Sequence, residues 1–368
     1  KIIKMNFQFQ GNNYNINRFP TNNNNSLQPW NSGDVLTLNY LAPFLTKESK
    51  IAIANDDYGF LAINLSQYRP INILNNKTQE NALEHNWKVN NLDEDNRSIS
   101  YALDTISSKI TFGILRIPKA IDLFELYLEQ LHSSLEENGT IVCSFMTKYF
   151  TPQLIKVAEK YFETVTQSRA EKKARLIILT NKKEIATTPL IRTINYKEQE
   201  IKQYYGVFSA EHIDYATQFL IERLDIKFNE KTILDLASGN GILAKVAQDL
   251  APSSDLYLLD DSHLAIESSK LNIDTEKATF VHDNNLNQLD DNFFDLVISN
   301  PPFHFEYEIN ISVPLGMFTQ VERCLKPNGR FIMVANTHLQ YKTHLENKFS
   351  RVKIIDENKK FRVYECYK

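Results

Sequence analysis

The stretch TILDLASGNGILAKVAQDL, residues 232–250, sets the fold of the C-terminal half of the chain. TILDL is a short apolar run typical of a buried strand, and ILAKVAQDL has the apolar spacing of a helix. Between them, Gly239 and Gly241 permit a tight turn and a close approach of the backbone to a ligand. We therefore expect a strand, a glycine turn and a helix in this order.

The same alternation continues to the C-terminus. We expect strands at 255–260, 279–283, 294–299 and 330–335, helices at 263–271 and 314–325, and a closing hairpin of 351–355 with 361–367. A preceding helix is expected within 207–224, with Ser209 as its N-cap. This order predicts an α/β fold with a mainly parallel, doubly wound sheet, in which ligands bind beyond the carboxyl ends of the strands.

The N-terminal half is similar to the C-terminal half. ANDDYGFLAINL, residues 54–65, aligns with LASGNGILAKVA, residues 236–247, so that Gly59 lies opposite Gly241, and Gly139 lies opposite Gly329. The first copy lacks a second glycine and has Ile-Pro-Lys, residues 117–119, in place of Asn-Pro-Pro-Phe. We interpret it as a degenerate copy of the same fold; chance similarity of two α/β halves is the alternative.

The composition sets further limits. The chain has 368 residues, of which 42% are hydrophobic, which predicts two domains. We place them at 1–185 and 186–368, with a linker within 181–200. No apolar run is long enough to span a membrane, and three cysteines without a CxxC pair argue against a metal site or a disulfide framework. We expect a cytoplasmic protein without a metal and, because a duplicated chain resembles a dimer, a monomer.

The charge is unevenly divided. The net charge is -4. Residues 1–190 hold 21 Lys and Arg against 19 Asp and Glu, a balance of +2, and the other 20 against 26 give -6. The densest basic segment is RAEKKAR, with Arg169, Lys172, Lys173 and Arg175. We expect it to contact RNA; an ordinary solvated surface is the alternative.

Acidic residues follow the second expected strand of the C-terminal half. Asp260 and Asp261 come about twenty residues after the glycine turn, at the distance where a carboxylate can accept both hydroxyls of a ribose. The alternative for Asp261 is a cap at the start of the next helix. Together with the glycine turn, these residues predict a nucleotide-containing cofactor.

The fourth expected strand of this half runs into SNPPFH, residues 299–304. Two prolines stiffen the backbone, so that the side-chain carbonyl of Asn300 and the backbone carbonyl of Pro301 can both accept from one NH2 group. Phe303 then offers a face for stacking a planar base. A strand-terminating turn with Asn300 as a cap is the alternative.

Four segments carry a resemblance to a known family: residues 206–214 (GVFSAEHID), residues 235–241 (DLASGNG), the strand end at 260–261, and residues 299–304. With them the chain resembles the class I S-adenosylmethionine-dependent methyltransferases, and among these the bacterial ribosomal-RNA guanine-N2 methyltransferases of the RsmC/RlmG type. Residues 18–34, 55–60 and 116–131 resemble the large-subunit members. One departure is Ala237, where the family usually has the first glycine of its turn.

The resemblance implies two tandem class I methyltransferase domains, each a Rossmann-like, doubly wound seven-stranded sheet, the first of them degenerate. It implies S-adenosyl-L-methionine as the cofactor, bound by Phe208, Ser209, Asp235, Ala237, Gly239, Gly241, Asp260 or Asp261, Asp283 or Asn284, and Asn300. Catalysis is expected from Asn300, Pro301, Pro302 and Phe303, and His304 is a further candidate for RNA contact.

The implied reaction is methylation of the exocyclic N2 of a guanine in ribosomal RNA, with 23S rRNA or an assembling subunit as the partner. Three alternatives stay open from the sequence: the corresponding small-subunit (16S) enzyme, a protein glutamine N5-methyltransferase, and an RNA-binding assembly factor without catalysis.

Overall fold

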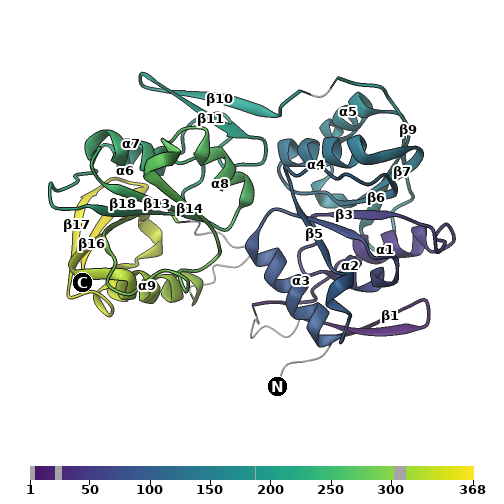
Figure 1. Cartoon of the computed structure of the whole chain (residues 1–368), viewed down its shortest axis with the longest axis horizontal. Helices are drawn as coiled ribbons and strands as arrows, with labels where there is room; N and C mark the ends of the chain where they lie inside the picture. Colours follow the sequence, from purple (N-terminus) through teal and green to yellow (C-terminus); the bar gives the residue numbers. More distant parts are fainter. Residues whose placement is uncertain (1–4, 21–26, 187, 302–311) are drawn as a thin grey trace. The chain divides into compact units, whose positions relative to one another are not determined.

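The computed structural model describes residues 5–20, 27–186, 188–301 and 312–368. The chain divides into two compact units, 1–190 and 191–368, each built around one seven-stranded sheet with helices packed on it (Figure 1). In both sheets five parallel strands are followed by an antiparallel pair. The predicted tandem doubly wound fold is therefore confirmed.

In the second unit the strand order is β14-β13-β12-β15-β16-β18-β17. The strands are β12 (Thr232–Leu236), β13 (Asp255–Asp260), β14 (Ala278–His282), β15 (Phe294–Ser299), β16 (Leu325–Asn336), β17 (Arg351–Glu357) and β18 (Phe361–Tyr367). The helices are α6 (Tyr215–Ile221), α7 (Ile242–Leu250), α8 (His263–Lys270), α9 (Ser312–Cys324) and α10 (Lys342–Glu346).

Both faces of this sheet are buried, which explains its nearly continuous apolar strands. Leu234 of β12 lies in a core with Phe318 and Phe331 on one face. The neighbouring Ile233 lies in a core with Leu243 of α7 on the other face. Successive side chains of a strand point to opposite faces, so the sheet needs a helical layer on each side.

The first unit repeats this topology in the order β5-β4-β3-β6-β7-β9-β8. The strands are β3 (Ile51–Ala54), β4 (Ile71–Leu74), β5 (Ser98–Tyr101), β6 (Ile110–Arg116), β7 (Leu135–Met146), β8 (Phe162–Gln167) and β9 (Ala174–Lys182), preceded by a separate hairpin of β1 (Met5–Phe9) and β2 (Asn12–Ile16). The helices are α1 (Ser32–Leu41), α2 (Phe60–Asn64), α3 (Lys77–Val89), α4 (Ile121–Ser134) and α5 (Pro152–Tyr161).

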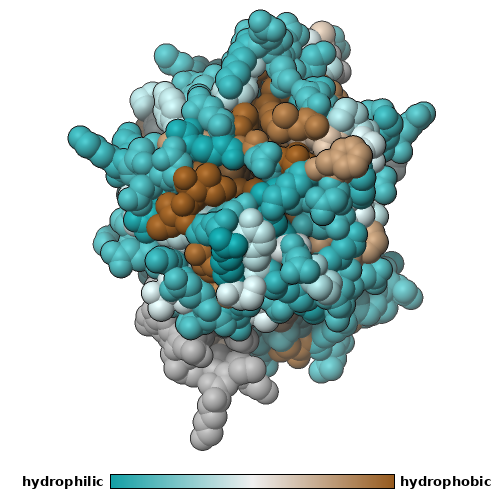
Figure 2. All heavy atoms as spheres, turned by 90° about the vertical axis from the view of Figure 1, so that its left-hand side faces the viewer, coloured by the Kyte–Doolittle hydropathy of each residue, from teal (hydrophilic) through white to brown (hydrophobic). Residues whose placement is uncertain are grey.

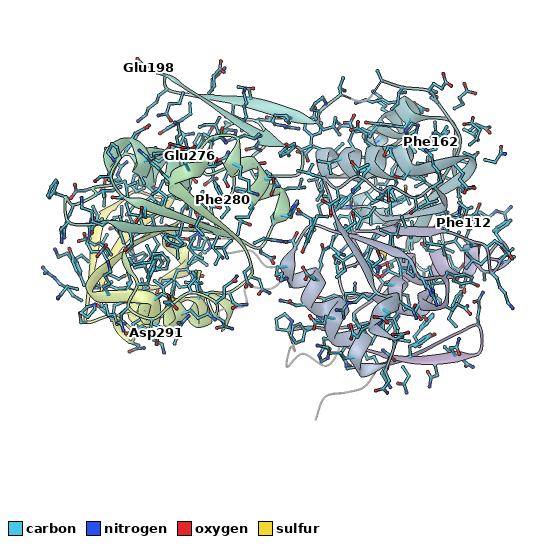
Figure 3. The ribbon with its side chains drawn as sticks, in the orientation of Figure 1. Phe112, Phe162, Glu198, Glu276, Phe280 and Asp291 are labelled. Carbon is cyan, nitrogen blue, oxygen red and sulfur yellow. The ribbon has the colours of Figure 1, made fainter. Side chains whose placement is uncertain are left out.

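The segment between the sheets differs from the expectation in two respects, although the two units divide between residues 190 and 191, inside the proposed linker. The proposed linker at 181–200 contains β10 (Ile191–Tyr196), which pairs antiparallel with β11 (Gln199–Tyr204) because Ile194 and Ile201 face each other in a buried cluster. The exposed Glu198 lies at the tip of this hairpin (Figure 3). Ser209 is not a helix cap: α6 begins six residues later, and its N-cap is Asp214.

Apolar residues are distributed in patches over a mainly hydrophilic surface on the side of the second unit that Figure 2 shows. The most exposed large apolar side chains of this unit are Phe228, Phe208, Tyr215 and Leu250. No helix within the described parts of the chain is long and apolar enough to cross a membrane.

Candidate active site

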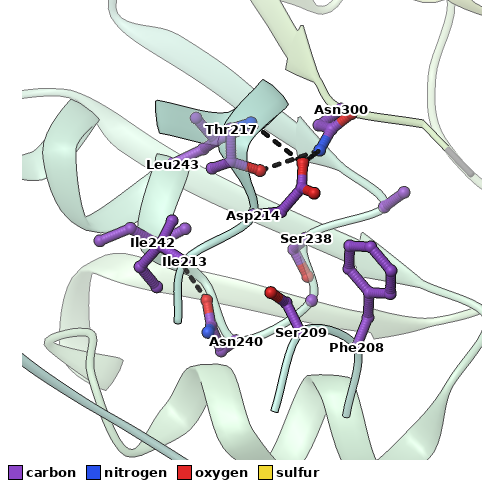
Figure 4. A pocket seen from close by; sticks show the side chains of 12 residues that line it. Phe208, Ser209, Ile213, Asp214, Thr217, Ser238, Asn240, Ile242, Leu243 and Asn300 are labelled. Atoms are coloured by element: carbon purple, nitrogen blue, oxygen red, sulfur yellow. Dashed lines mark hydrogen bonds between the residues drawn. The ribbon is translucent and has the colours of Figure 1, made fainter. Parts of the chain in front are cut away.

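A pocket opens at the carboxyl ends of β12 and β15 in the second unit (Figure 4). Three segments that are distant in sequence form it: the chain between β11 and α6 with the start of α6, the glycine turn with the first residues of α7, and the residue after β15. The lining residues are Phe208, Ser209, Ile213, Asp214, Thr217, Ala237, Ser238, Gly239, Asn240, Ile242, Leu243 and Asn300. This is the edge of the sheet where the sequence predicts a ligand.

The glycine turn is built from left-handed backbone. Gly239 and Gly241 have φ of 55° and 80°, and Ala237 has φ of 59°. Alanine is less favourable than glycine in this region, so the departure at Ala237 costs stability without changing the course of the chain. A Cβ on Gly239 would meet no atom within 4 Å, whereas one on Gly241 would lie 2.8 Å from Cβ of Ser269 in α8.

These two glycines therefore predict different effects of the same substitution. Gly241→Ala should lower the free energy of unfolding by about 2–4 kcal/mol, because two costs add. The alanine must adopt a left-handed backbone conformation, and its Cβ overpacks the contact between α7 and α8. Gly239→Ala should lower it by about 1–2 kcal/mol, because only the left-handed backbone contributes. Urea unfolding at equilibrium measures both, and equal losses would contradict a special role of the α7–α8 contact.

The side chain of Asp260, at the end of β13, is hydrogen-bonded to the glycine turn. Its Oδ2 accepts a hydrogen bond from the backbone N–H of Gly239 at 2.9 Å, and its Oδ1 accepts one from Ser262 at 2.8 Å. Burial raises the pKa of this carboxyl to about 6, against the lowering by these two N–H groups. Ser262, and not Asp261, is the N-cap of α8. Asp260 is thus the carboxylate coupled to the glycine turn.

Two buried oxygens of this region have no hydrogen-bond partner within the described residues: Oδ1 of Asp235 and Oγ of Ser238. The other carboxyl oxygen of Asp235 accepts from the backbone N–H of Ala244 at 2.9 Å, and burial raises the pKa of this carboxyl to about 7. Ser238 lines the pocket. A buried polar atom without a partner is costly, so these oxygens favour a ligand that carries hydrogen-bond donors.

Asn300 lies directly after β15, and the nitrogen of its side-chain amide is hydrogen-bonded to residues at the start of α6. Nδ2 donates to Oδ2 of Asp214 at 3.0 Å and to Oγ1 of Thr217 at 2.9 Å (Figure 4). The amide oxygen forms no hydrogen bond with the described residues. Because Nδ2 has two hydrogens and both are used, the end of Asn300 that remains for a ligand is a hydrogen-bond acceptor.

A fully buried glutamine links two walls of the pocket. Nε2 of Gln203 donates to the backbone carbonyl of Val207 at 3.1 Å, and its Oε1 accepts from Nδ2 of Asn240 at 2.7 Å. The chain that carries Phe208 and Ser209 is thereby tied to the glycine turn. Gln203 lies on β11, and no sequence motif singles it out.

The structure brings together five of the predicted site residues on the pocket wall, namely Phe208, Ser209, Ala237, Gly239 and Asn300. Asp235, Gly241 and Asp260 lie next to them in the same strand ends. Asp283 and Asn284 follow β14; Asp283 bonds within its own loop, to the backbone N–H of Asn284 and to the side chains of Asn285 and Gln288. Pro301 is buried. Pro302, Phe303 and His304 lie outside the described residues.

Ile213, Asp214, Thr217, Ser238, Asn240, Ile242 and Leu243 line the pocket but were not predicted from the sequence. Asp214 offered a signal, since an aspartate before a helical apolar pattern is a strong N-cap candidate. The predicted basic residues lie in the first unit, around the β8–β9 turn: Arg169, Lys172 and Lys173 are exposed, and Arg175 is half-buried beside Gln167.

The first unit has charged side chains where the second has its site. The registers of β3–β6 and β12–β15 place Arg116 opposite Asn300. Asp57, opposite Gly239, pairs with the guanidinium of Arg116. The registers of β3–β4 and β12–β13 place the buried Leu74 opposite Asp260. The first unit therefore lacks both the open turn and the carboxylate at the strand end. These are the features by which it is a degenerate copy of the second unit.

Two family models match the chain, one in each unit. A model of the RLMG N-terminal domain matches residues 4–183, and a model of the methyltransferase small domain matches residues 198–365. The chain is 29% identical to "Ribosomal RNA large subunit methyltransferase G" of Psychromonas ingrahamii over 96% of both chains, and 29% identical to the protein of that name from Yersinia enterocolitica, over 96% of this chain and 92% of the relative.

A solved structure has the same fold over the whole chain. It is the T. thermophilus 16S rRNA N2 G1207 methyltransferase (RsmC) in complex with AdoMet and guanosine, with a TM-score of 0.76, 18% identity, and coverage of 99% of this chain and 98% of that one. The fold and the site thus define a methyltransferase of class I. More particularly, the chain joins an RLMG N-terminal domain to a methyltransferase small domain.

The cofactor of this class is S-adenosylmethionine, and the residues present fit it. The unpartnered oxygens of Asp235 and Ser238 suit the amino group of a methionine moiety, and Gly239 leaves room for the backbone to approach a ligand. Asp260 offers carboxylate lone pairs beyond its two backbone bonds for ribose hydroxyls. When bound, S-adenosylmethionine supplies an electrophilic methyl group on a sulfonium centre.

Proposed function

We propose that this protein methylates the exocyclic N2 of a guanine in ribosomal RNA, with large-subunit (23S) RNA as the substrate. The observation that carries the proposal is the orientation of Asn300, whose nitrogen is bonded to Asp214 and Thr217, so that the atom of its amide left for a ligand is the acceptor oxygen. An acceptor at this position suits an NH2 donor. The names of the curated relatives favour ribosomal RNA of the large subunit.

In this proposal the residues of the site align and polarise the amine. The amide oxygen of Asn300 and the backbone carbonyl of Pro301 accept its two N–H bonds, which favours a pyramidal nitrogen with its lone pair free for attack. Positioning of this kind turns a bimolecular reaction into a nearly unimolecular one. Because the N2 of a paired guanine lies inside the duplex, the base must be unpaired or flipped out to reach Asn300.

The proposal is tested by transfer of a radiolabelled methyl group from S-adenosylmethionine to separate acceptors: protein-free 23S RNA, protein-free 16S RNA, assembled subunits and a release factor. Labelled N2-methylguanosine from 23S RNA is the expected product. Label in 16S RNA alone would assign the small subunit, label in the release factor would identify a glutamine methyltransferase, and cofactor binding without transfer would indicate an assembly factor.

We further propose that the first unit binds the RNA backbone through the β8–β9 turn. Arg169, Lys172 and Lys173 are exposed there, with the exposed carboxylate of Glu171 among them. Each phosphate contact to single-stranded RNA contributes about 0.7 to the slope of log affinity against log salt concentration. Changing the three basic residues to Gln should therefore reduce the slope by about two.

The matched control changes three exposed lysines elsewhere in the same unit, Lys47, Lys109 and Lys156, to Gln. RNA affinity over a salt series, with cofactor affinity measured in parallel, distinguishes the two sets. A slope that is the same in both triple variants would show that the turn is ordinary solvated surface.

A further inference from the structure

Two residues at the start of α6 determine which atom of the Asn300 amide remains available to a ligand. Oδ2 of Asp214 lies 3.0 Å and Oγ1 of Thr217 lies 2.9 Å from Nδ2 of Asn300. A carboxylate can only accept a hydrogen bond, so the amide atom that faces it must be the nitrogen. With the nitrogen fixed in this way, the oxygen is directed away from α6 (Figure 4).

The two acceptors are themselves held in place. Oδ2 of Asp214 also accepts from the backbone N–H groups of Ala216 at 3.0 Å and Thr217 at 3.2 Å. Thr217 is 7% exposed, and its helix packs into the core of the second unit through Leu220, which is fully buried. The acceptors therefore belong to the rigid part of the fold, which is what accurate placement of a reacting group requires.

The first unit has a different pair at the same positions. Thr217 is the third residue after the N-cap Asp214, and Asp34 is the third residue after the N-cap Asn31. Asp34 lies 3.6 Å from Nε of Arg116, the counterpart of Asn300. In the second unit the hydroxyl of Thr217 faces the amide of Asn300. In the first unit the carboxylate of Asp34 faces the guanidinium of Arg116. In each unit, therefore, the side chain on the helix suits the side chain that follows the strand.

We propose that Asp214 and Thr217 are positioning residues that select an amine as the methyl acceptor by holding the Asn300 oxygen toward the substrate. If the amide turned over, its NH2 would be the group available to the substrate and would favour a carbonyl. This role rests on the proposed function, since it concerns the group that is methylated. It assigns to α6 a part in substrate specificity that acts through Asn300.

The test compares Thr217→Val, Thr217→Ser and Asp214→Asn. Val keeps the shape of threonine and removes the acceptor, and one neutral hydrogen bond corresponds to a loss of about tenfold in kcat. Asp214→Asn keeps an acceptor oxygen and the cap of α6 but replaces a charged acceptor by a neutral one, and should lower kcat by about tenfold or less. Thr217→Ser restores the hydroxyl and should stay within about twofold of the wild type. The KM for RNA and the Kd for S-adenosylmethionine should change little in all three.

A double-mutant cycle separates positioning from general damage to the fold. In an Asn300→Ala background, measured at single turnover, Thr217→Val should cause no further loss, because the amide that it positions is gone. An additional tenfold loss in that background, or equal losses for Val and Ser at position 217, would overturn the proposal.

A second readout does not depend on the substrate. In the protein without ligands, the side-chain NH2 of Asn300, assigned by the loss of its NMR signals in Asn300→Asp, should be shifted downfield and exchange slowly with water. Thr217→Val should shift one of its two proton signals and speed exchange. Unchanged signals would overturn the proposal, whereas changed signals with no transfer to any RNA would leave the positioning intact and refute the proposed function.

Discussion

The Asn300→Ala variant is expected to transfer methyl groups at least about a hundredfold more slowly than the wild type, while binding S-adenosylmethionine and RNA with nearly unchanged affinity. In the proposed function its side chain acts on one NH2 group, whereas each ligand would make many other contacts. Removal of one oriented hydrogen-bonding group that acts on the reacting atoms costs about a hundredfold to a thousandfold in kcat, or about 2.7–4 kcal/mol in the barrier. The loss should therefore appear in kcat rather than in KM.

Single-turnover transfer to 23S RNA with saturating cofactor measures this effect, and calorimetry of cofactor binding is its control. Asn300→Asp is a second variant: it keeps two acceptor oxygens but places a carboxyl group beside Oδ2 of Asp214, 3.0 Å from the lost nitrogen, so it should not rescue activity. A transfer rate within about twofold of the wild type in Asn300→Ala, less than about 0.4 kcal/mol, would refute the role of Asn300 in catalysis.

The fold could be predicted because its strands and helices have unmistakable local patterns. β12 and β15 are short apolar runs that end in turn residues, and α7 follows its glycine turn immediately. The errors arose where tertiary contacts, and not the local sequence, determine the backbone conformation. β10 has few apolar residues, and its strand conformation depends on the pairing of Ile194 with Ile201 and on burial by α6 and α7. Ser209 was expected to be a cap, but it has a left-handed φ of 62°.

The site could be predicted only as far as its residues belong to contiguous motifs. Asn300 and Gly239 stand in such motifs, and Asp260 follows a strand at a recognisable distance. Asp214 and Thr217 contact Asn300 across 86 and 83 residues of sequence, and no local pattern reports a contact of that kind. The role of Gln203 likewise depends on Asn240, 37 residues away.

The alignment of the two halves also shows which residues of the first unit stand at the positions of the site residues. With Ala54 opposite Leu236, the counterpart of Gly239 is Asp57, and the strand registers make Arg116 the counterpart of Asn300. The ion pair between Asp57 and Arg116 puts two large charged groups at positions that are open or neutral in the second unit. Loss of the site in the first unit is therefore a replacement by a structural ion pair and not a simple deletion.

The Asp260→Asn variant is expected to bind S-adenosylmethionine at least about a hundredfold more weakly than the wild type, which corresponds to about 2.7 kcal/mol. The lost bonds are of charged type, from ribose hydroxyls to a carboxylate, and asparagine also places an NH2 group against an N–H of Gly239 or Ser262. In the wild type the pKa of Asp260 is raised to about 6, so the carboxylate proposed to bind the ribose is depleted as the pH falls through 6. Cofactor affinity should be constant above about pH 8 and fall below it, by up to about tenfold per pH unit for each of the two carboxylates, Asp235 and Asp260.

Asp261→Asn provides the matched control, because Asp261 is the adjacent carboxylate and its charge raises the pKa of Asp260. This variant should keep wild-type affinity at pH 8, and its pH profile should move to lower pH. The Asp260→Asn profile should lose the step near pH 6, leaving the contribution of Asp235, whose pKa is raised to about 7 by burial. Calorimetry between pH 5 and pH 8.5 measures all three proteins. Wild-type affinity in Asp260→Asn together with a large loss in Asp261→Asn would transfer the ribose contact to Asp261.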